Sequence, residues 1–366
     1  MLTVEPSNNH PHVDLAHLRS PIEPAHRGRA QRLVEAAERI GVVRLLRGIH
    51  DRGPPALIVL AYHRVMPTDA LELYPFDQEL ISATPAQFDW QMRYLRENLH
   101  PVAIRQVIEY LDGAASLPPG AVAVTFDDGF ADTFRYAFPI LKRHSIPATI
   151  FLATGYVDSR EPFWFELAAY LVYHVEPNAL ILPDGRTLPP DDSKQTRTNS
   201  LRQIHGLLKD LPNAQRVAII REWTEKFHDD IAHDAFGHSQ PISWQQVSDM
   251  AAAGIDFGSH TVSHPNLTRL TEAELDWELT ESKRVLEERL QREVNSLAYP
   301  IGTSSAFDDR VIAATKRCGF KLGVTYLSGA NPLSAIKRFE LHRHGIGLGM
   351  TLPYFRALTS LPSWLD

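Results

Sequence analysis

The hydrophobic positions of this chain fall into short continuous runs, separated by longer stretches with helical periodicity. Apolar runs at 56–62, 121–126 and 148–154 predict strands buried on both faces, which is typical of parallel sheets. Further strands are expected at 255–259, 295–299, 321–325 and 339–344. Because predicted helices alternate with these strands, the pattern indicates β/α units around a parallel sheet.

Local signals mark the ends of several predicted helices. Thr84, followed by Pro85 and Gln87, forms a capping box with proline at the first helical position. Thr271 and Glu274 form a second capping box. Pro139 lies near the middle of a helix predicted over 132–144, so we expect a kink or an early stop there.

The strand–helix rhythm is interrupted between about 156 and 242. Helices are predicted there over 167–175, 201–209 and 214–227, with a polar stretch before the second. We interpret this region as a helical insertion between barrel units. The aromatic run Phe163, Trp164 and Phe165 could line a sugar site, but anchoring the insertion is the simpler interpretation.

The first 52 residues differ from the rest. They combine an irregular start with an amphipathic helix over 31–47, and the stretch 25–52 carries a net charge of +4. A basic amphipathic helix can lie on an anionic membrane surface, although such a helix can also pack on its own protein. The remainder, 53–366, is expected to form one domain that includes the insertion.

Composition narrows the class of protein. The 366 residues are 44% hydrophobic and 22% charged, as in globular proteins with a core. A net charge of −7 argues against a general nucleic-acid binder. The single cysteine, Cys318, excludes an intrachain disulfide, and the first 20 residues lack the pattern of a secretory signal. These features favour a cytoplasmic protein.

Two adjacent carboxylates, Asp127 and Asp128, follow the 121–126 strand directly. Ligands of α/β proteins bind at the carboxyl ends of strands, so these acids are candidates for chemistry. The two charges would repel each other unless a cation or a shared proton intervened. Asp128-Gly129 is also a common turn dipeptide, so a simple turn is the alternative.

His260 and His264 follow another predicted strand, and His63 follows the 56–62 strand. Pro265 disfavours a helix at His264, so the pair is expected on a loop where two imidazoles can converge. Two histidines and Asp128 would give three ligands with an open position, which is the catalytic pattern for zinc. A bound cation lowers the pKa of water from about 15.7 to about 7, and Asp127 could then act as general base.

Three motifs in this order resemble the polysaccharide deacetylases of carbohydrate esterase family four, which carry the NodB homology domain. They are TFDDGF at 125–130, SHTVSHP at 259–265 and AYPIG at 298–302. The resemblance implies a distorted (β/α) barrel of the NodB type. It also implies that Asp127 is the general base and that Asp128, His260 and His264 bind a divalent metal. Zinc is expected first, with Co²⁺, Ni²⁺ or Mn²⁺ as alternatives.

The resemblance extends to further site residues and shows one departure. The third motif places Ile301 as oxyanion donor through its backbone N–H, with Tyr299 beside it. Where many members carry an arginine that braces the base, this chain has Ala298, and Arg343 is a candidate replacement. LAYHRV at 60–65 resembles the early motif of biofilm poly-N-acetylglucosamine deacetylases, which implies that His63 is the acid that protonates the leaving amine.

We therefore expect a metal-dependent deacetylase that hydrolyses N-acetyl groups of N-acetylhexosamine units in a cell-surface polysaccharide or its lipid-linked precursor. The expected partner is an N-acetylated glycan, met at the inner face of the membrane. Two alternatives remain at this point: an esterase that cleaves O-acetyl groups, and a non-catalytic glycan-binding or assembly subunit with the same fold.

Overall fold

The computed structural model describes residues 55–68, 77–159, 161–191, 193–229, 231 and 239–360. The basic helix expected over 31–47 lies outside the described residues, so its proposed contact with a membrane stays a prediction. The cytoplasmic location also stays a prediction. Among the described helices, none combines the length and the apolarity needed to cross a bilayer.

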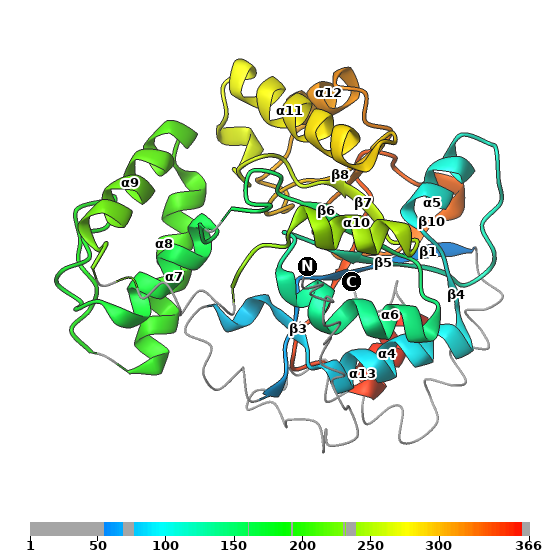
Figure 1. Cartoon of the computed structure of the whole chain (residues 1–366), viewed down its shortest axis with the longest axis horizontal. Helices are drawn as coiled ribbons and strands as arrows, with labels where there is room; N and C mark the ends of the chain where they lie inside the picture. The colour runs from blue at the N-terminus through cyan, green and yellow to red at the C-terminus, as the bar shows by residue number, and fades with distance from the viewer. Residues whose placement is uncertain are drawn as a thin grey trace, which may run out of the picture.

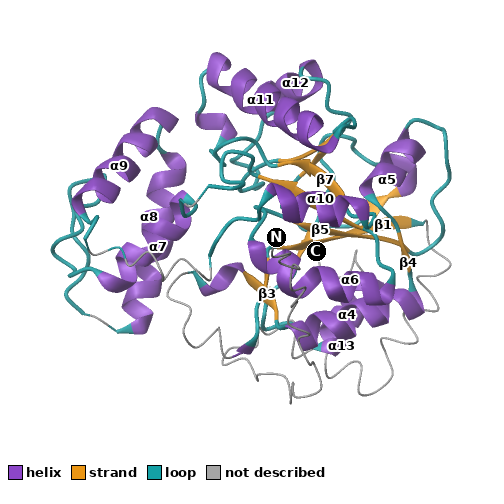
Figure 2. Ribbon diagram, in the orientation of Figure 1, coloured by secondary structure: helices purple, strands orange, loops and turns teal. Residues whose placement is uncertain are grey.

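A curved, mainly parallel sheet forms the centre of the fold (Figure 2). Its order in the described residues is β10-β1-β5-β6-β7-β8-β9, with β11 also paired to β1 and β4 to β5. The strands are β1 (Ala56–Tyr62), β4 (His100–Pro101), β5 (Ala121–Phe126), β6 (Ala148–Leu152), β7 (Asp256–Ser259), β8 (Ser296–Ala298), β9 (Leu322–Val324), β10 (Asn331–Pro332) and β11 (His344–Gly345). Two shorter strands, β2 (Arg64–Val65) and β3 (Ile81–Ala83), pair separately.

Residues 341–345 connect the two ends of this sheet. Leu341 bridges to Val324 of β9, and His344 of β11 pairs in parallel with Leu60 of β1. The segment therefore lies between the last and first strands of the series and brings the sheet close to a closed barrel. This confirms the (β/α) barrel with helical elements that the sequence predicts.

Alternate residues of the strands face two different cores. Ile58, Leu60, Val122 and Val124 pack with the surrounding helices. Their neighbours form a second cluster with residues of β6, β8 and β9: Leu57, Val59, Ala121, Ala123, Phe151, Ala298 and Val324. The second cluster is the interior of the barrel. Because side chains alternate along a strand, Thr125 shares the interior face of Ala121 and Ala123.

Helices surround the barrel (Figure 1). They are α4 (Pro85–Asn98), α5 (Ile104–Leu111), α6 (Phe138–His144), α10 (Trp244–Ala252), α11 (Glu272–Leu290), α12 (Asp309–Arg317) and α13 (Leu352–Ser360). Both expected capping boxes are present, at Thr84 before α4 and at Thr271 before α11. The helix expected over 132–144 is split at its proline: a π-helical segment, Thr133–Ala137, precedes α6, and Pro139 lies in the first turn of α6.

The segment between β6 and β7 holds a group of helices that stands to one side of the barrel, at the left of Figure 1. They are α7 (Trp164–His174), α8 (Lys194–Asp210) and α9 (Asn213–Lys226), and their hydrophobic core also includes Met66, Ile81, Phe130 and Ala153 from outside the insert. We call these three helices the helical insert. Helix α8 begins earlier than predicted because Ser193 caps it by accepting a hydrogen bond from the Thr196 N–H.

Five predicted strands are shorter in the structure, and those expected over 255–259, 295–299 and 321–325 lose only one or two end residues. The strand expected over 148–154 ends at Leu152, after which residues 153–158 turn across the end of the barrel. The strand expected over 339–344 was wrong in its extent, since only His344 and Gly345 form a strand, β11. The Leu341 bridge to β9 and the two-residue pairing with β1 are enough to hold this segment between those two strands.

Candidate functional site

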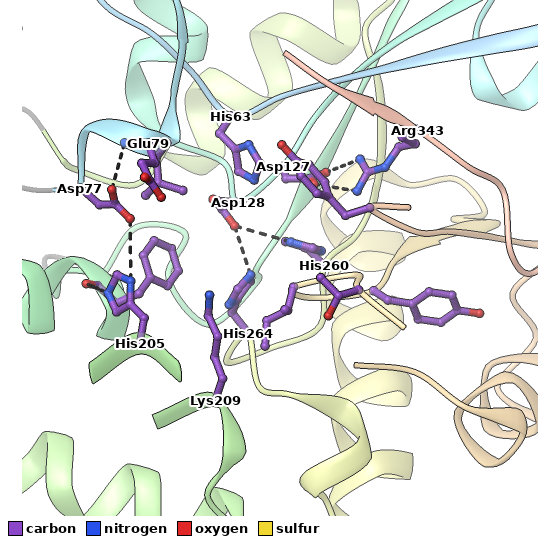
Figure 3. Close-up of a pocket in the computed structure, with 16 residues that line it drawn as sticks. His63, Asp77, Glu79, Asp127, Asp128, His205, Lys209, His260, His264 and Arg343 are labelled. Atoms are coloured by element: carbon purple, nitrogen blue, oxygen red, sulfur yellow. Dashed lines mark hydrogen bonds and ion pairs between the residues drawn. The ribbon is translucent and has the colours of Figure 1, made fainter. Parts of the chain in front are cut away.

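Functional groups from four strand ends meet in one pocket of about 340 Å³ (Figure 3). His63 follows β1, Asp127 and Asp128 follow β5, His260 follows β7, and Ile301 lies beyond β8. These strands belong to one parallel series, in which β6 lies between β5 and β7, so their carboxyl ends lie at one edge of the sheet. The pocket therefore gathers residues that are far apart in the sequence.

Asp128, His260 and His264 converge in this pocket with little exposure, at 2%, 2% and 7%. The Asp128 Oδ1 atom lies 3.5 Å from His260 Nε2 and 3.4 Å from His264 Nε2. These separations are too long for good hydrogen bonds, and Asp128 Oδ1 has no hydrogen-bond partner in the described part of the chain. One ligand atom from each residue lies within 4.8 Å of the others. A buried carboxylate oxygen without a donor, facing two imidazole nitrogens, fits a divalent cation with an open position.

His260 is held in the tautomer that a metal ligand needs. Its Nδ1 atom lies 2.7 Å from the Ala298 carbonyl oxygen, a geometry in which Nδ1–H donates. The lone pair of Nε2 is then free on the side of Asp128. Ala298, which replaces an arginine expected from the family, contributes through its backbone. Burial lowers the pKa of both His260 and His264, so both rings favour the neutral form that binds metal.

Left-handed backbone conformations shape the loops of the site. Asp128, Thr261, His264 and Ile301 have φ of 69°, 68°, 52° and 67°. Such values are uncommon for residues other than glycine and carry strain, most of all for β-branched Thr261 and Ile301. At Asp128 this conformation accompanies a change of partner, since Asp127 contacts Arg343 and the next residue, Asp128, faces the two imidazoles. Nothing in the local sequence at Thr261 or Ile301 predicts this conformation.

Glu278 of α11 holds the loop that carries the two histidines. Its carboxylate accepts hydrogen bonds from the Val262 N–H at 2.7 Å and the Ser263 N–H at 3.0 Å, and Glu278 is only 2% exposed. These charge-assisted bonds offset the strain of the adjacent left-handed residues. Sequence reasoning missed this residue, because helical periodicity alone gives no sign that a glutamate on α11 caps a loop.

Asp127 is braced by Arg343, which the sequence offered as the replacement for the arginine missing at Ala298. Arg343 Nη1 and Nη2 lie 2.7 Å from Asp127 Oδ1 and Oδ2. Arg343 also donates to the Thr325 carbonyl at 2.7 Å and to Thr125 Oγ1 at 3.2 Å, and it is fully buried. Burial alone would raise the pKa of Asp127, but the Arg343 charge, His260 and the hydrogen bonds from Arg343 lower this pKa to about 2. Asp127 is therefore an ionised carboxylate at neutral pH.

His63 lies at the end of β1, where its backbone N–H donates to Ser82 Oγ at 2.9 Å. Its ring lines the pocket and contacts the ring of Tyr326, with 5.4 Å between the centroids. Burial lowers the pKa of His63 to about 4, although Asp127 acts in the opposite direction. The imidazole is therefore neutral at pH 7 in the free protein, and it must gain a proton before it can donate one.

Ile301 and Tyr299 both line the pocket. In the described part of the chain, the Ile301 N–H has no hydrogen-bond acceptor, as a donor kept for a ligand would require. The Tyr299 hydroxyl instead donates to the Phe339 carbonyl at 3.0 Å, and its ring stacks on Phe307. Tyr299 therefore contributes to the wall with its hydroxyl already engaged.

The helical insert forms another wall of the same pocket. Phe163, Trp164 and Phe165 are buried in the core of the insert, as the anchoring interpretation predicts, and Phe165 also lines the pocket. Trp164 Nε1 donates to the His264 carbonyl at 3.0 Å, which ties the insert to the histidine loop. Other pocket residues from α8, His205 and Lys209, were not foreseen from the sequence.

Comparison with known proteins gives a consistent assignment. The family model described as polysaccharide deacetylase matches residues 114–323, more than half of the chain. A putative polysaccharide deacetylase of Bacillus subtilis (strain 168), YxkH, is 20% identical over 310 residues, which cover 84% of this chain and 78% of that protein. The poly-beta-1,6-N-acetyl-D-glucosamine N-deacetylase of Escherichia coli (strain K12) is 37% identical over 84 residues, which span 23% of this chain and only 12% of that protein.

Among solved structures, the Streptococcus pyogenes deacetylase PplD, in complex with acetate, has a similar fold. The TM-score is 0.55 at 22% identity, and the match covers 84% of this chain and 100% of that one. The strand-end pocket, the order of the three motifs and the family match agree with one another. The chain belongs to the polysaccharide deacetylase family.

Proposed function

We propose that this chain is a metal-dependent hydrolase that removes acetyl groups from N-acetylhexosamine units of a polysaccharide. The observation that carries the proposal is the pairing of a buried Asp-His-His cluster with a second, ionised carboxylate, Asp127, directly beside it. The name of the Escherichia coli relative, a poly-beta-1,6-N-acetyl-D-glucosamine N-deacetylase, supports an N-acetylated glucosamine polymer as the substrate class.

Asp128, His260 and His264 would hold the divalent cation, with zinc expected first because the set combines two imidazoles with one carboxylate. At such a site the cation supplies Lewis acidity, which lowers the pKa of water and polarises a carbonyl oxygen. The cation would also satisfy Asp128 Oδ1, whose pKa is raised by burial and by the neighbouring Asp127 charge.

Other residues of the pocket would transfer protons and donate a hydrogen bond to the acetyl oxygen. Asp127, held ionised by Arg343, takes a proton from the attacking water. The Ile301 N–H donates to the acetyl oxygen as negative charge develops there. His63 takes up a proton during turnover and delivers it to the sugar nitrogen, because an amine anion is too basic to leave.

One observation keeps O-acetyl ester hydrolysis as a second candidate. Because the pKa of His63 is low, little of the ring is protonated at neutral pH and able to act as an acid. The alkoxide that leaves from an O-acetyl ester needs such an acid less than the amine that leaves from an N-acetyl amide. The two functions differ in the substrate that releases acetate.

The experiment compares acetate release from N-acetylglucosamine oligomers and from acetylated xylan by the metal-loaded protein. N-deacetylation predicts release from the oligomers, abolished by a chelator and restored by adding Zn²⁺. Release from acetylated xylan alone would support the esterase. Release from neither substrate, by a protein that retains one equivalent of metal, would favour a non-catalytic glycan-binding role.

A further inference from the structure

The wall of the pocket opposite Arg343 is built from two pieces of the chain, helix α8 and the segment 77–80. His205 and Lys209 lie one turn apart on α8 and line the pocket together. Asp77, Glu79 and Leu80 line it from the other piece. Figure 3 shows the Lys209 side chain extending between His205 and His264 toward Asp128, and Asp77 lying beyond His205.

Polar contacts join these two pieces at the rim of the pocket. Arg202 of α8 pairs with Glu79 at 2.5 Å, and Lys194 donates to Gln78 at 3.4 Å. Deeper in the wall, His205 Nδ1 lies 3.7 Å from Asp77 Oδ2. These contacts fix α8 against the segment 77–80, so the fold sets the positions of Lys209 and Asp77 relative to each other.

Lys209 and Asp77 have binding capacity that the protein does not use. Among the described residues, no carboxylate lies within ion-pair distance of Lys209 Nζ, although burial lowers the pKa of this amine. Asp77 Oδ1 accepts one hydrogen bond, from the Glu79 N–H at 2.9 Å, while Oδ2 has only the long contact to His205. A partly buried ammonium or carboxylate is stabilised by further hydrogen bonds, so both groups favour a polar ligand between them.

The charges of this wall indicate what kind of ligand it takes. Glu79 is neutralised by Arg202, and the remaining pair, Asp77 and Lys209, balances to zero. An anionic ligand would meet Asp77, and a cationic ligand would meet Lys209. A neutral hydroxyl satisfies both, because each hydroxyl can accept from an ammonium and donate to a carboxylate.

We propose that Lys209 and Asp77 bind ring hydroxyls of the hexose whose acetyl group lies over the Asp128-His260-His264 cluster, so that the helical insert determines which sugar is accepted. The inference rests on the proposed function and extends it to substrate specificity. The cavity of about 340 Å³ is at the lower end of small-molecule sites, which suits one hexose with its acetyl group.

The test measures binding of a β-1,6-linked N-acetylglucosamine pentamer to the metal-loaded protein by titration calorimetry. Lys209→Met removes the ammonium donor, and Lys316→Met removes an exposed lysine of α12, outside the pocket, as a matched control. We expect Lys209→Met to weaken binding by about tenfold or more, since it deletes a hydrogen bond to a charged group. Lys316→Met should bind like the wild type, and Lys209→Arg should recover much of the loss.

A kinetic comparison separates a binding role from a structural one. We expect KM for the pentamer to rise in Lys209→Met and in Asp77→Asn, whereas kcat/KM for 4-nitrophenyl acetate, which has no sugar, should change far less. Asp77→Asn keeps an acceptor for the Glu79 N–H, so it provides a second variant if Lys209→Met folds poorly.

Wild-type affinity in both Lys209→Met and Asp77→Asn would overturn the inference, as would equal losses on the pentamer and on 4-nitrophenyl acetate. A wild-type protein that does not bind the pentamer would also count against it. A protein that binds the pentamer through Lys209 but releases no acetate would sustain the inference and contradict the proposed deacetylase activity, so the two can fail separately.

Discussion

Arg343 and Asp127 face each other in a two-pronged ion pair inside the barrel, with both nitrogen–oxygen distances at 2.7 Å. Arg343 comes from the segment that lies between β9 and β1, and Asp127 comes from the end of β5. A planar guanidinium matches a carboxylate at two points, so it fixes both the charge and the orientation of Asp127. The segment 341–345, which closes the barrel, therefore also positions Asp127, the proposed base.

Replacing Arg343 by Met should shift the pH profile toward higher pH. The pKa of Asp127, about 2, lies below the ordinary 3.8 because of Arg343, so removing the Arg343 guanidinium raises the pKa of Asp127. The base is then protonated over a wider acidic range, and the acidic limb of kcat/KM moves upward. Arg343→Lys keeps the charge without the two-point geometry and should show a smaller shift. An unchanged acidic limb in Arg343→Met would contradict this role.

Replacing Arg64 by Met should destabilise the protein strongly. Arg64 is fully buried and pairs with Asp132 at 2.6 Å and with Glu166 of α7 at 3.5 Å. Its loss leaves two buried carboxylates without their cation, at a cost of about 3–5 kcal/mol in the free energy of unfolding. Denaturant unfolding measures this difference.

The control for Arg64 is Arg143, which pairs with Asp89 at 2.8 Å while its side chain is 48% exposed. Arg143→Met should change the free energy of unfolding by less than about 1 kcal/mol. Similar losses for Arg64→Met and Arg143→Met would show that the buried pairs of Arg64 with Asp132 and Glu166 stabilise the protein no more than a partly exposed pair does.

Replacing Glu278 by Ala should weaken metal binding although Glu278 is not a proposed ligand. Its carboxylate fixes the N–H groups of Val262 and Ser263, between the two histidines. Loss of such support typically lowers metal affinity about 10–100-fold. Zinc affinity measured against a competing chelator tests this, with exposed Glu288→Ala on the same helix as control. Equal affinities in the two variants would refute it.

Replacing His63 by Ala should affect amides more than esters. The proposed role of His63 is to protonate the leaving nitrogen, and general acid catalysis typically contributes about 10²–10⁴-fold. We expect kcat for N-acetylglucosamine oligomers to fall within this range, with a much smaller fall for 4-nitrophenyl acetate, whose leaving group needs no proton. Parallel losses on the two substrates would assign His63 to another step.

The sequence predicted the elements that carry strong local patterns. The apolar runs of β1 and β5, the capping boxes at Thr84 and Thr271, and the break at Pro139 all follow from residues that are neighbours in the chain. The strand-end positions of Asp127, Asp128 and His260 were found for the same reason, because a buried strand followed by polar groups is visible without any tertiary information.

Features that depend on distant contacts were found only in part. Arg343 could be named as a candidate, but its contact with Asp127 spans 216 residues and depends on the short segment 341–345 between β9 and β1. The left-handed conformation of Ile301 runs against its β-branched side chain, so tertiary contacts impose it. Lys209 and Glu278 lie on ordinary amphipathic helices, where a residue that faces a pocket looks like one that faces solvent.

The central claim is that Asp127 acts as the general base and is not one of the metal ligands, which are Asp128, His260 and His264. Metal content and acetate release from N-acetylglucosamine oligomers, measured together on Asp127→Asn, test this most directly. The account predicts one equivalent of bound metal, as in the wild type, with a rate of acetate release about 10²–10⁴-fold lower. A metal-loaded Asp127→Asn protein that releases acetate at the wild-type rate would contradict it.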